Sequence, residues 1–417
     1  MTNWSRVYSR CWRMCMVSVA ALAVLCVLSG CLSPIALNRA VLEYDRTTAK
    51  IQAEMLLLNI ARANRREPVH FTAVSSVAAT FNFQVTAGWL GRLADNTATG
   101  SAAALTLGAS ASENPTVTII PVEGEAFAKR MLTPLSGNRV LFLAVGGLEP
   151  SAILRLLARR YIDMSGEGGD HIRNNPRYKD QYIEFRRIIL HIASLDLADA
   201  LYSPQIVYEE VVPAPYPTDS SASEVTDTVI GVLKEGYLWQ PPVGGGPPVL
   251  TRVVKGRRIL SNYDLSDLSN DQRRRLHKEV ERLPKNSLFV DIRPGHPGGE
   301  YPLHGHFLFR SFRQCLHFIA RGISVAPEFD VEKDPRTGPV HANPARTLVI
   351  QETADEPSEA LFKVQHSGSW YWIPEAPEGA SQEAAWDQIA FRLVSAVYNM
   401  TVTDISTQPR PSITIAK

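Results

Sequence analysis

Residues Val69–Gly91 read VHFTAVSSVAATFNFQVTAGWLG, and no other stretch says as much about how the chain folds. Between Ala79 and Trp89 the residues alternate between apolar and polar types. A repeat of two residues is the spacing of a β-strand with one apolar and one polar face, whereas a helix repeats every three or four residues. The pattern therefore predicts a long amphipathic strand, with apolar positions that include Phe81, Phe83, Val85 and Trp89.

The segment that follows predicts a second strand returning beside the first. Apolar residues alternate with small polar ones between Leu105 and Ala111, and TVTIIPV continues the extended pattern to Val122. Small and polar residues around Asp95–Gly100 are typical of a turn. Together these patterns predict a long β-hairpin over about residues 73–122, whose return strand is the less apolar of the two.

Two roles are open for this hairpin. Strands of roughly 9 to 11 residues suffice to cross an outer membrane. A single hairpin leaves unpaired backbone groups at its edges, so insertion in lipid requires several protomers to close the sheet. The alternative, which we favour, is an edge hairpin over the protein's own core. Under the first role, Phe81, Phe83, Val85 and Trp89 are the candidate contacts with membrane or partner.

The remaining patterns predict an α+β fold, with amphipathic helices and the long hairpin in the N-terminal half and a smaller mixed α/β C-terminal half. Helical spacing and end signals predict helices over residues 39–64, 124–135, 149–163, 180–201, 270–283, 311–322 and 381–398. Short apolar runs predict strands over residues 140–145, 287–292 and 347–351, and a hairpin over 361–373 that turns at Ser367-Gly368.

Residues 213–248 are rich in Pro, Gly and Ser, which is typical of a linker. We therefore expect an N-terminal α+β domain over residues 31–212 and a C-terminal α+β domain over residues 249–417, preceded by a signal peptide over residues 1–30.

The prediction of a signal peptide rests on the pattern of the first residues. Arg6, Arg10 and Arg13 precede an apolar run from Met14 to Leu28. At roughly 15 residues this run is shorter than the roughly 20 that a membrane-spanning helix needs, and it has the length of a secretory signal. The run ends in LSGC, residues 28–31, which resembles the bacterial lipobox. That resemblance implies cleavage before Cys31 and acylation of its thiol.

A lipid anchor at Cys31 sets the expected location. One acyl chain gives marginal membrane binding, whereas a diacylglyceryl group plus an N-acyl chain such as palmitate anchors a protein stably. In enteric bacteria, lipoproteins that are retained in the inner membrane typically have an Asp after the acylated Cys. This chain has Leu32 and Ser33 there. We therefore expect a lipoprotein of the outer membrane that faces mainly the periplasm and contacts the membrane through its lipid.

Charge and cysteine content exclude several classes of protein. The formal net charge of the chain is +1, and cleavage after residue 30 removes three arginines and no acidic residue. The mature chain therefore lacks the basic balance of a nucleic-acid-binding protein. With Cys31 acylated, Cys315 is its remaining thiol, so no internal disulfide is expected. Cys315 lies on the apolar side of a predicted helix, where we expect it to be buried.

Several patches of the mature chain stand out: AEMLLLNIARAN (53–64) with the strand after it, NPTVTIIPVEGEAFAKRMLTPL (114–135), SFRQCLHFIARG (311–322) and HSGSWYWIPE (366–375). Together they resemble an uncharacterised family of proteobacterial envelope lipoproteins. The resemblance covers most of the mature chain in patches and implies a protein of the envelope. The family has no known activity, ligand or catalytic residue, so no functional residue is carried over.

The segment GHPGGEYPLHGHF contains the strongest enzyme-like feature of the chain. His304 and His306 share one face if the segment is a strand, and His296 with Glu300 lies close by in sequence, so a zinc site is conceivable. This pattern is only a weak indication of a zinc site, because a catalytic zinc site also needs a positioned base. The G-x-S-x-G, H-E-x-x-H, P-loop and G-x-G-x-x-G motifs are absent from the sequence.

We therefore expect a non-enzymatic structural or assembly component of an envelope complex, without cofactor, metal or nucleic-acid partner, that joins an envelope protein or further copies of itself. Two alternatives stay open. One is an oligomeric outer-membrane pore or secretion component that uses the hairpin. The other is a metal-dependent hydrolase that uses His296, His304 and His306.

Overall fold

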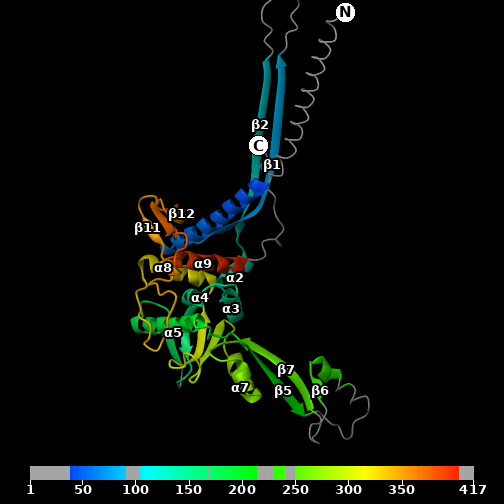
Figure 1. Ribbon diagram of the computed structural model, residues 1–417, viewed down its shortest axis with the longest axis vertical. Coiled ribbons are helices and arrows are strands. Elements are labelled where there is room, and N and C mark those ends of the chain that lie inside the picture. The colour runs from blue at the N-terminus through cyan, green and yellow to red at the C-terminus, as the bar shows by residue number, and fades with distance from the viewer. Residues whose placement is uncertain are drawn as a thin grey trace, which may run out of the picture. The chain divides into compact units, whose positions relative to one another are not determined.

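A computed structural model of the protein shows an α+β fold (Figure 1). It divides into two compact units, and each is described by itself. The described part of unit 1 contains residues 38–55 and the hairpin, whereas that of unit 2 contains residues 56–70 and the chain from residue 123 to residue 402. The residues that the structure describes are 38–90, 104–166, 169–213, 227, 230–240 and 249–402.

Unit 1 contains the predicted hairpin. Strand β1 (Phe71–Leu90) pairs antiparallel with β2 (Ala104–Val122), from Phe71 opposite Val122 to Leu90 opposite Ala104. The existence and direction of both strands are as predicted, and the predicted turn lies outside the described residues. The predicted helix before the hairpin is also present, over residues 38–64, with its residues from Leu56 onward in unit 2.

The central sheet of unit 2 has the strand order β4-β3-β10-β9-β8 in the described residues. Its neighbours are antiparallel except for β8 and β9, which are parallel. Every residue of β9, the predicted strand SLFVDI, is buried. The strands are β3 (Ala158–Asp163), β4 (Asp170–Arg173), β8 (Leu260–Ser261), β9 (Ser287–Ile292) and β10 (Leu303–Phe309).

Helices α4 (Pro150–Leu157) and α5 (Lys179–Leu197) contribute to the core of unit 2. Pro150 occupies the first turn of α4, where its missing N–H costs nothing. Phe307 of β10 is fully buried, and its ring contacts Tyr161 of β3 and Phe185 of α5 at centroid distances of 5.1 Å and 6.1 Å. Aromatic packing therefore ties the sheet to α5.

The prediction of one helix over residues 149–163 was half wrong. The helix ends at Leu157, and residues 158–163 form β3 instead. Side chains from distant segments satisfy the carbonyl groups at this helix end: the Asn174 amide donates to the carbonyls of Arg155 and Ala158, and Arg310 donates to that of Leu156. A local sequence pattern contains neither partner.

Residues 140–145 were predicted as a buried strand and form a helix instead, α3 (Gly137–Val145). The Ser136 hydroxyl caps its N-terminus by accepting from the backbone N–H of Arg139. Val140 and Leu141 are buried, while Phe142 and Val145 are exposed, so the apolar run has one buried side at helical spacing. Short apolar runs do not separate helix from strand by periodicity alone.

The predicted helix over residues 124–135 is present as α2 (Glu125–Leu132). In the C-terminal part, the predicted helices and hairpin are present as α8 (Phe312–Ser324), α9 (Trp386–Val402), β12 (Ala360–His366) and β13 (Ser369–Pro374). Cys315 of α8 is buried, as expected, and burial raises the pKa of its thiol to about 12. The β12–β13 turn is at Ser367-Gly368, and both residues have positive φ, which a two-residue hairpin turn requires.

The predicted strand over residues 347–351 was wrong except at its last residue, where β11 (Gln351–Thr353) begins and pairs with β13. The backbone of residues 347–349 binds side chains instead of a sheet. The N–H of Thr347 donates to Glu328, its carbonyl accepts from the Trp386 indole, and the N–H of Val349 donates to Asp387. Contacts with these distant side chains replace strand pairing.

Helix α7 (Asn270–Glu281) begins with a capping box from Ser269 and Gln272.

A further sheet of unit 2 has the strand order β5-β7-β6. Strands from both sides of the predicted linker share sheets, so the described residues do not divide at 213–248. Within that segment the structure describes β6, which pairs with β7. The strands are β5 (Gln205–Pro213), β6 (Leu238–Gln240) and β7 (Val249–Arg258).

Candidate functional site

Two candidates from the sequence fall on described residues, the hairpin and the histidine segment. The third, the lipidation site Cys31, lies outside the described residues together with the whole predicted signal. Among the described helices, none combines the length and the apolar character needed to cross a membrane.

The register of the hairpin aligns the two sequence patterns. Phe83 stands opposite Ala111, Val85 opposite Ala109, and Trp89 opposite Leu105. The polar positions also stand opposite each other, as in the pair Gln84 and Ser110. A shift by one residue would place apolar positions opposite polar ones, so the observed register is the one that keeps the amphipathic pattern across both strands. Side chains of these residues lie outside the described ones.

The distal part of the hairpin lacks the residues that usually keep strand edges from pairing. From the pair Thr80–Asn114 to the pair Leu90–Ala104, neither strand contains a proline, and Glu113 is the one charged residue. Proteins generally block exposed edges with charges, prolines or short strands. This stretch has about 11 residues in each strand, which equals the length of a membrane-crossing strand.

Among the described residues, β1 and β2 pair with no other strand. Each strand therefore presents one edge of N–H and C=O groups without a ladder partner in the described chain. An isolated two-stranded hairpin is marginally stable in water. The hairpin accordingly has the backbone chemistry of an element that accepts a further strand.

The histidine segment forms an ion-pair cluster in unit 2. The ring nitrogens of His304 bind two carboxylates, with Nδ1 3.0 Å from Asp291 Oδ1 and Nε2 2.9 Å from Glu279 Oε1. The hydrogen bond with Asp291 is the main cause that raises the pKa of His304. When protonated, His304 is a cationic bridge between β9, β10 and α7, and an imidazolium that donates from both ring nitrogens has no lone pair for a metal.

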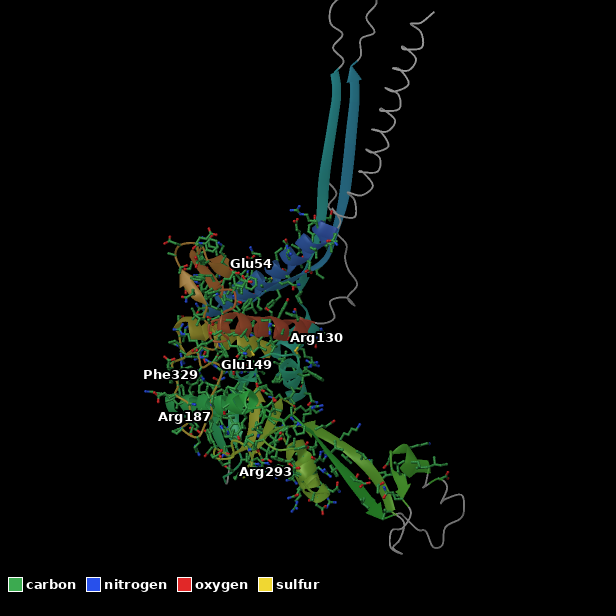
Figure 2. All side chains as sticks on the ribbon, viewed as in Figure 1. Glu54, Arg130, Glu149, Arg187, Arg293 and Phe329 are labelled. Atoms are coloured by element: carbon green, nitrogen blue, oxygen red, sulfur yellow. The ribbon has the colours of Figure 1, made fainter. Side chains whose placement is uncertain are left out.

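Asp291 is the centre of this cluster. Its side chain is 4% exposed, and it accepts from Tyr263 at 2.5 Å and from Arg293, labelled in Figure 2, at 2.8 Å. Burial alone would raise the pKa of Asp291, but the hydrogen bonds from His304, Tyr263 and Arg293 outweigh it and lower the pKa. Sequence reasoning missed Asp291 and Glu279. The available signal was a single Asp in the otherwise apolar strand SLFVDI.

The other two histidines have different surroundings. His306 is buried, and burial followed by the charge of Arg257 lowers its pKa to about 4. His296 packs its ring against Tyr263 at a centroid distance of 5.3 Å. In the part of the chain that the structure describes, no group of three or more His, Cys, Asp or Glu side chains is arranged to hold a metal ion.

Comparison with protein-family models, curated proteins and solved structures found no match for this chain.

Proposed function

We propose that the protein is a lipid-anchored, non-enzymatic assembly component of a bacterial envelope complex, and that the hairpin β1–β2 joins it to a neighbouring protein of that complex. The observation that carries this proposal is the long, in-register hairpin, whose distal part is free of proline and whose strands pair only with each other in the described chain. The expected mode of association is strand addition at its edges.

The anchor is supported by the lipobox-like LSGC of residues 28–31. We expect Cys31→Ser to abolish labelling of the protein by radioactive fatty acid and to leave an unprocessed precursor, because no other thiol stands at the cleavage position. Normal processing and labelling of this variant would refute the anchor and leave the role of the hairpin to be judged separately.

The assembly role is tested by the size of the full-length protein extracted in mild detergent. We expect a uniform assembly larger than one chain. Phe83→Arg places a charge at an apolar register position and should reduce the fraction in the assembly, whereas Gln84→Arg, its matched control, places the same charge at the neighbouring polar position. A wild-type monomer, or equal behaviour of the two variants, would contradict the proposal.

A pore formed by hairpins of several protomers is a second candidate, favoured by the stretch of about 11 residues per strand in which Glu113 is the one charged residue. In that case Phe83→Arg would cost about 2–4 kcal/mol per strand near the middle of the bilayer. A lipid-free chain starting after Cys31 separates the two candidates. We expect it to stay in solution without detergent, because Ala, Ser, Thr and Gly dominate the return strand and give it little apolar area. Recovery only in detergent would favour the pore.

A further inference from the structure

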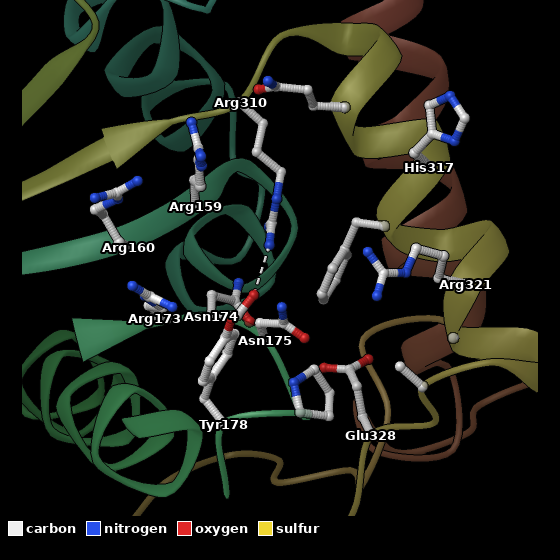
Figure 3. A pocket seen from close by; sticks show the side chains of 15 residues that line it. Arg159, Arg160, Arg173, Asn174, Asn175, Tyr178, Arg310, His317, Arg321 and Glu328 are labelled. Atoms are coloured by element: carbon white, nitrogen blue, oxygen red, sulfur yellow. Dashed lines mark hydrogen bonds between the residues drawn. The ribbon is translucent and has the colours of Figure 1, made fainter. Parts of the chain in front are cut away.

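Unit 2 contains a cavity of about 490 Å³ lined by arginines from separate segments (Figure 3). Arg159 and Arg160 come from β3 and Arg173 from the end of β4, while Arg321 comes from the last turn of α8. Arg310, between β10 and α8, lies between these two sides in the view of Figure 3. A volume in this range is typical of pockets that bind small ligands.

None of these five arginines forms a salt bridge with a residue in the described part of the chain. Other arginines of unit 2 are matched with carboxylates, including Arg252 with Glu210, Arg293 with Asp291 and Arg336 with Asp334. The cavity therefore collects positive charge that the described chain does not neutralise.

The one carboxylate in the lining is already engaged. Glu328 accepts hydrogen bonds from the Tyr182 hydroxyl and from the N–H and hydroxyl of Thr347, at 2.6 to 2.8 Å. Its charge also lies 3.8 Å from Arg155, outside the cavity lining. Glu328 is thus held by these groups and does not bridge to the five arginines.

The inner part of the cavity is held in place by hydrogen bonds. The Arg310 side chain is buried and donates to the carbonyls of Leu156 and Asn174 at 2.8 and 2.9 Å, the second of which is the dashed line in Figure 3. Its guanidinium group lies 3.9 Å from the centroid of the Phe318 ring. These contacts fix the position of the Arg310 charge beside the cavity, while both of its terminal nitrogens already donate to carbonyls, so direct two-point binding of an anion falls to the more exposed arginines of the lining.

The arginines also repel one another. Burial lowers the pKa of Arg160, and the charges of Arg159 and Arg173 lower it further. Burial lowers the pKa of Arg310 to about 10, and Arg159 adds to that shift. Repulsion between like charges lowers the stability of the fold, and a local loss of stability of this kind is typical of binding sites.

The basic lining continues beyond this cavity. A second cavity of about 590 Å³ shares His317 and Arg321 with the first and adds Arg66, Arg177 and Arg313. Glu67, the carboxylate in this second lining, is paired with His366 at 3.0 Å. Both cavities therefore take part of their basic lining from α8, and together they cover a surface larger than a single phosphate group occupies.

We propose that the arginine-lined cavity of unit 2 binds a phosphate-bearing ligand, either the headgroup of an anionic lipid or a soluble phosphate compound. Arginine forks match the oxygen atoms of phosphate in two-point hydrogen bonds. A single carboxylate would neutralise one of the five charges, whereas a phosphate group carries up to two negative charges near neutral pH and offers more acceptor oxygens. This proposal is independent of the role of the hairpin.

The test is calorimetric titration of the detergent-solubilised full-length protein with four probes at low salt: inorganic phosphate, pyrophosphate, glycerophosphoglycerol and glycerophosphocholine. We expect phosphate-bearing anions to bind and Arg159→Ala/Arg173→Ala to weaken binding about tenfold or more, because charge-assisted hydrogen bonds are lost. Stronger binding of glycerophosphoglycerol would assign the site to a lipid headgroup, and stronger binding of phosphate or pyrophosphate to a soluble compound.

The matched control is Arg275→Ala, in the exposed middle of α7 and outside both cavity linings. It should bind the probes like the wild type. The double variant should melt at the same temperature as the wild type or higher, since it relieves repulsion. Absence of binding by any probe at millimolar concentration, or equal binding by the double variant and the wild type, would overturn the proposal.

Discussion

Strands β9 and β10 of unit 2 are 6 and 7 residues long and have hydrogen-bonded neighbours on both sides, whereas β1 and β2 of unit 1 are 20 and 19 residues long and pair only with each other in the described chain. The short strands are stabilised by burial and by two neighbours each. In the described chain, each long strand has one neighbour and one edge without a ladder partner. Pairing and burial within this chain account for the sheet of unit 2 but not for the length of the hairpin, which is why we propose that the hairpin pairs with a neighbouring protein.

The largest expected effect concerns the central sheet of unit 2, whose strands are stabilised by burial in the protein's own core. Phe307→Ala removes a fully buried ring that contacts Tyr161 and Phe185, so it should lower the free energy of unfolding of unit 2 by about 3–5 kcal/mol. Phe142→Ala is the matched control, because Phe142 is 70% exposed and its loss should change stability by about 0.5 kcal/mol or less. Denaturant titration measures both, and similar losses would show that the core is placed wrongly.

A smaller effect is expected from the ionic cluster that joins β9, β10 and α7. The pKa of His304 is raised in the folded protein, so its stabilising contribution is complete below the unfolded pKa of about 6.5 and is lost as pH rises through the folded pKa. As pH rises above about 6.5, the wild type should therefore lose more unfolding free energy than His304→Gln. If denaturant titrations show the same change of unfolding free energy with pH for both proteins, the ion pairs of His304 do not stabilise the fold.

The smallest expected effect concerns metals. The two ring nitrogens of His304 bind carboxylates, and the described residues contain no arrangement for a metal ion. Addition of a chelator should leave the melting temperature of the purified protein unchanged. A lower melting temperature that zinc restores would support the hypothesis of a metal-dependent hydrolase that uses His296, His304 and His306.

The sequence predicted those elements whose cause is local. The alternation from Ala79 to Trp89 predicted β1, the apolar run SLFVDI predicted β9, and Ser367-Gly368 predicted a tight hairpin turn. The misassigned segments depend on distant partners. Residues 158–163 became β3 because they pair with β10, and the helix before them ends on Asn174 and Arg310.

The candidate site in unit 2 was not predictable from the sequence for the same reason. Arg159, Arg173, Arg310 and Arg321 come from segments separated by up to 162 positions, and each segment alone has an ordinary charge content. Only the β3–β10 pairing and the position of α8 place them around one cavity. In the hairpin, by contrast, the register brought together patterns that were already visible in each strand.

The most direct test of the central claim is residue-resolved amide hydrogen exchange of the detergent-extracted wild-type assembly. In an isolated hairpin, alternate N–H groups of β1 and β2 point outward and exchange quickly, whereas in β9 and β10, with neighbours on both sides, nearly all are protected. If the hairpin pairs with a neighbouring protein, consecutive amides along residues 80–90 and 104–114 should be protected, as in β9 and β10. Protection of alternate amides alone would contradict the claim that the hairpin pairs with a neighbouring protein.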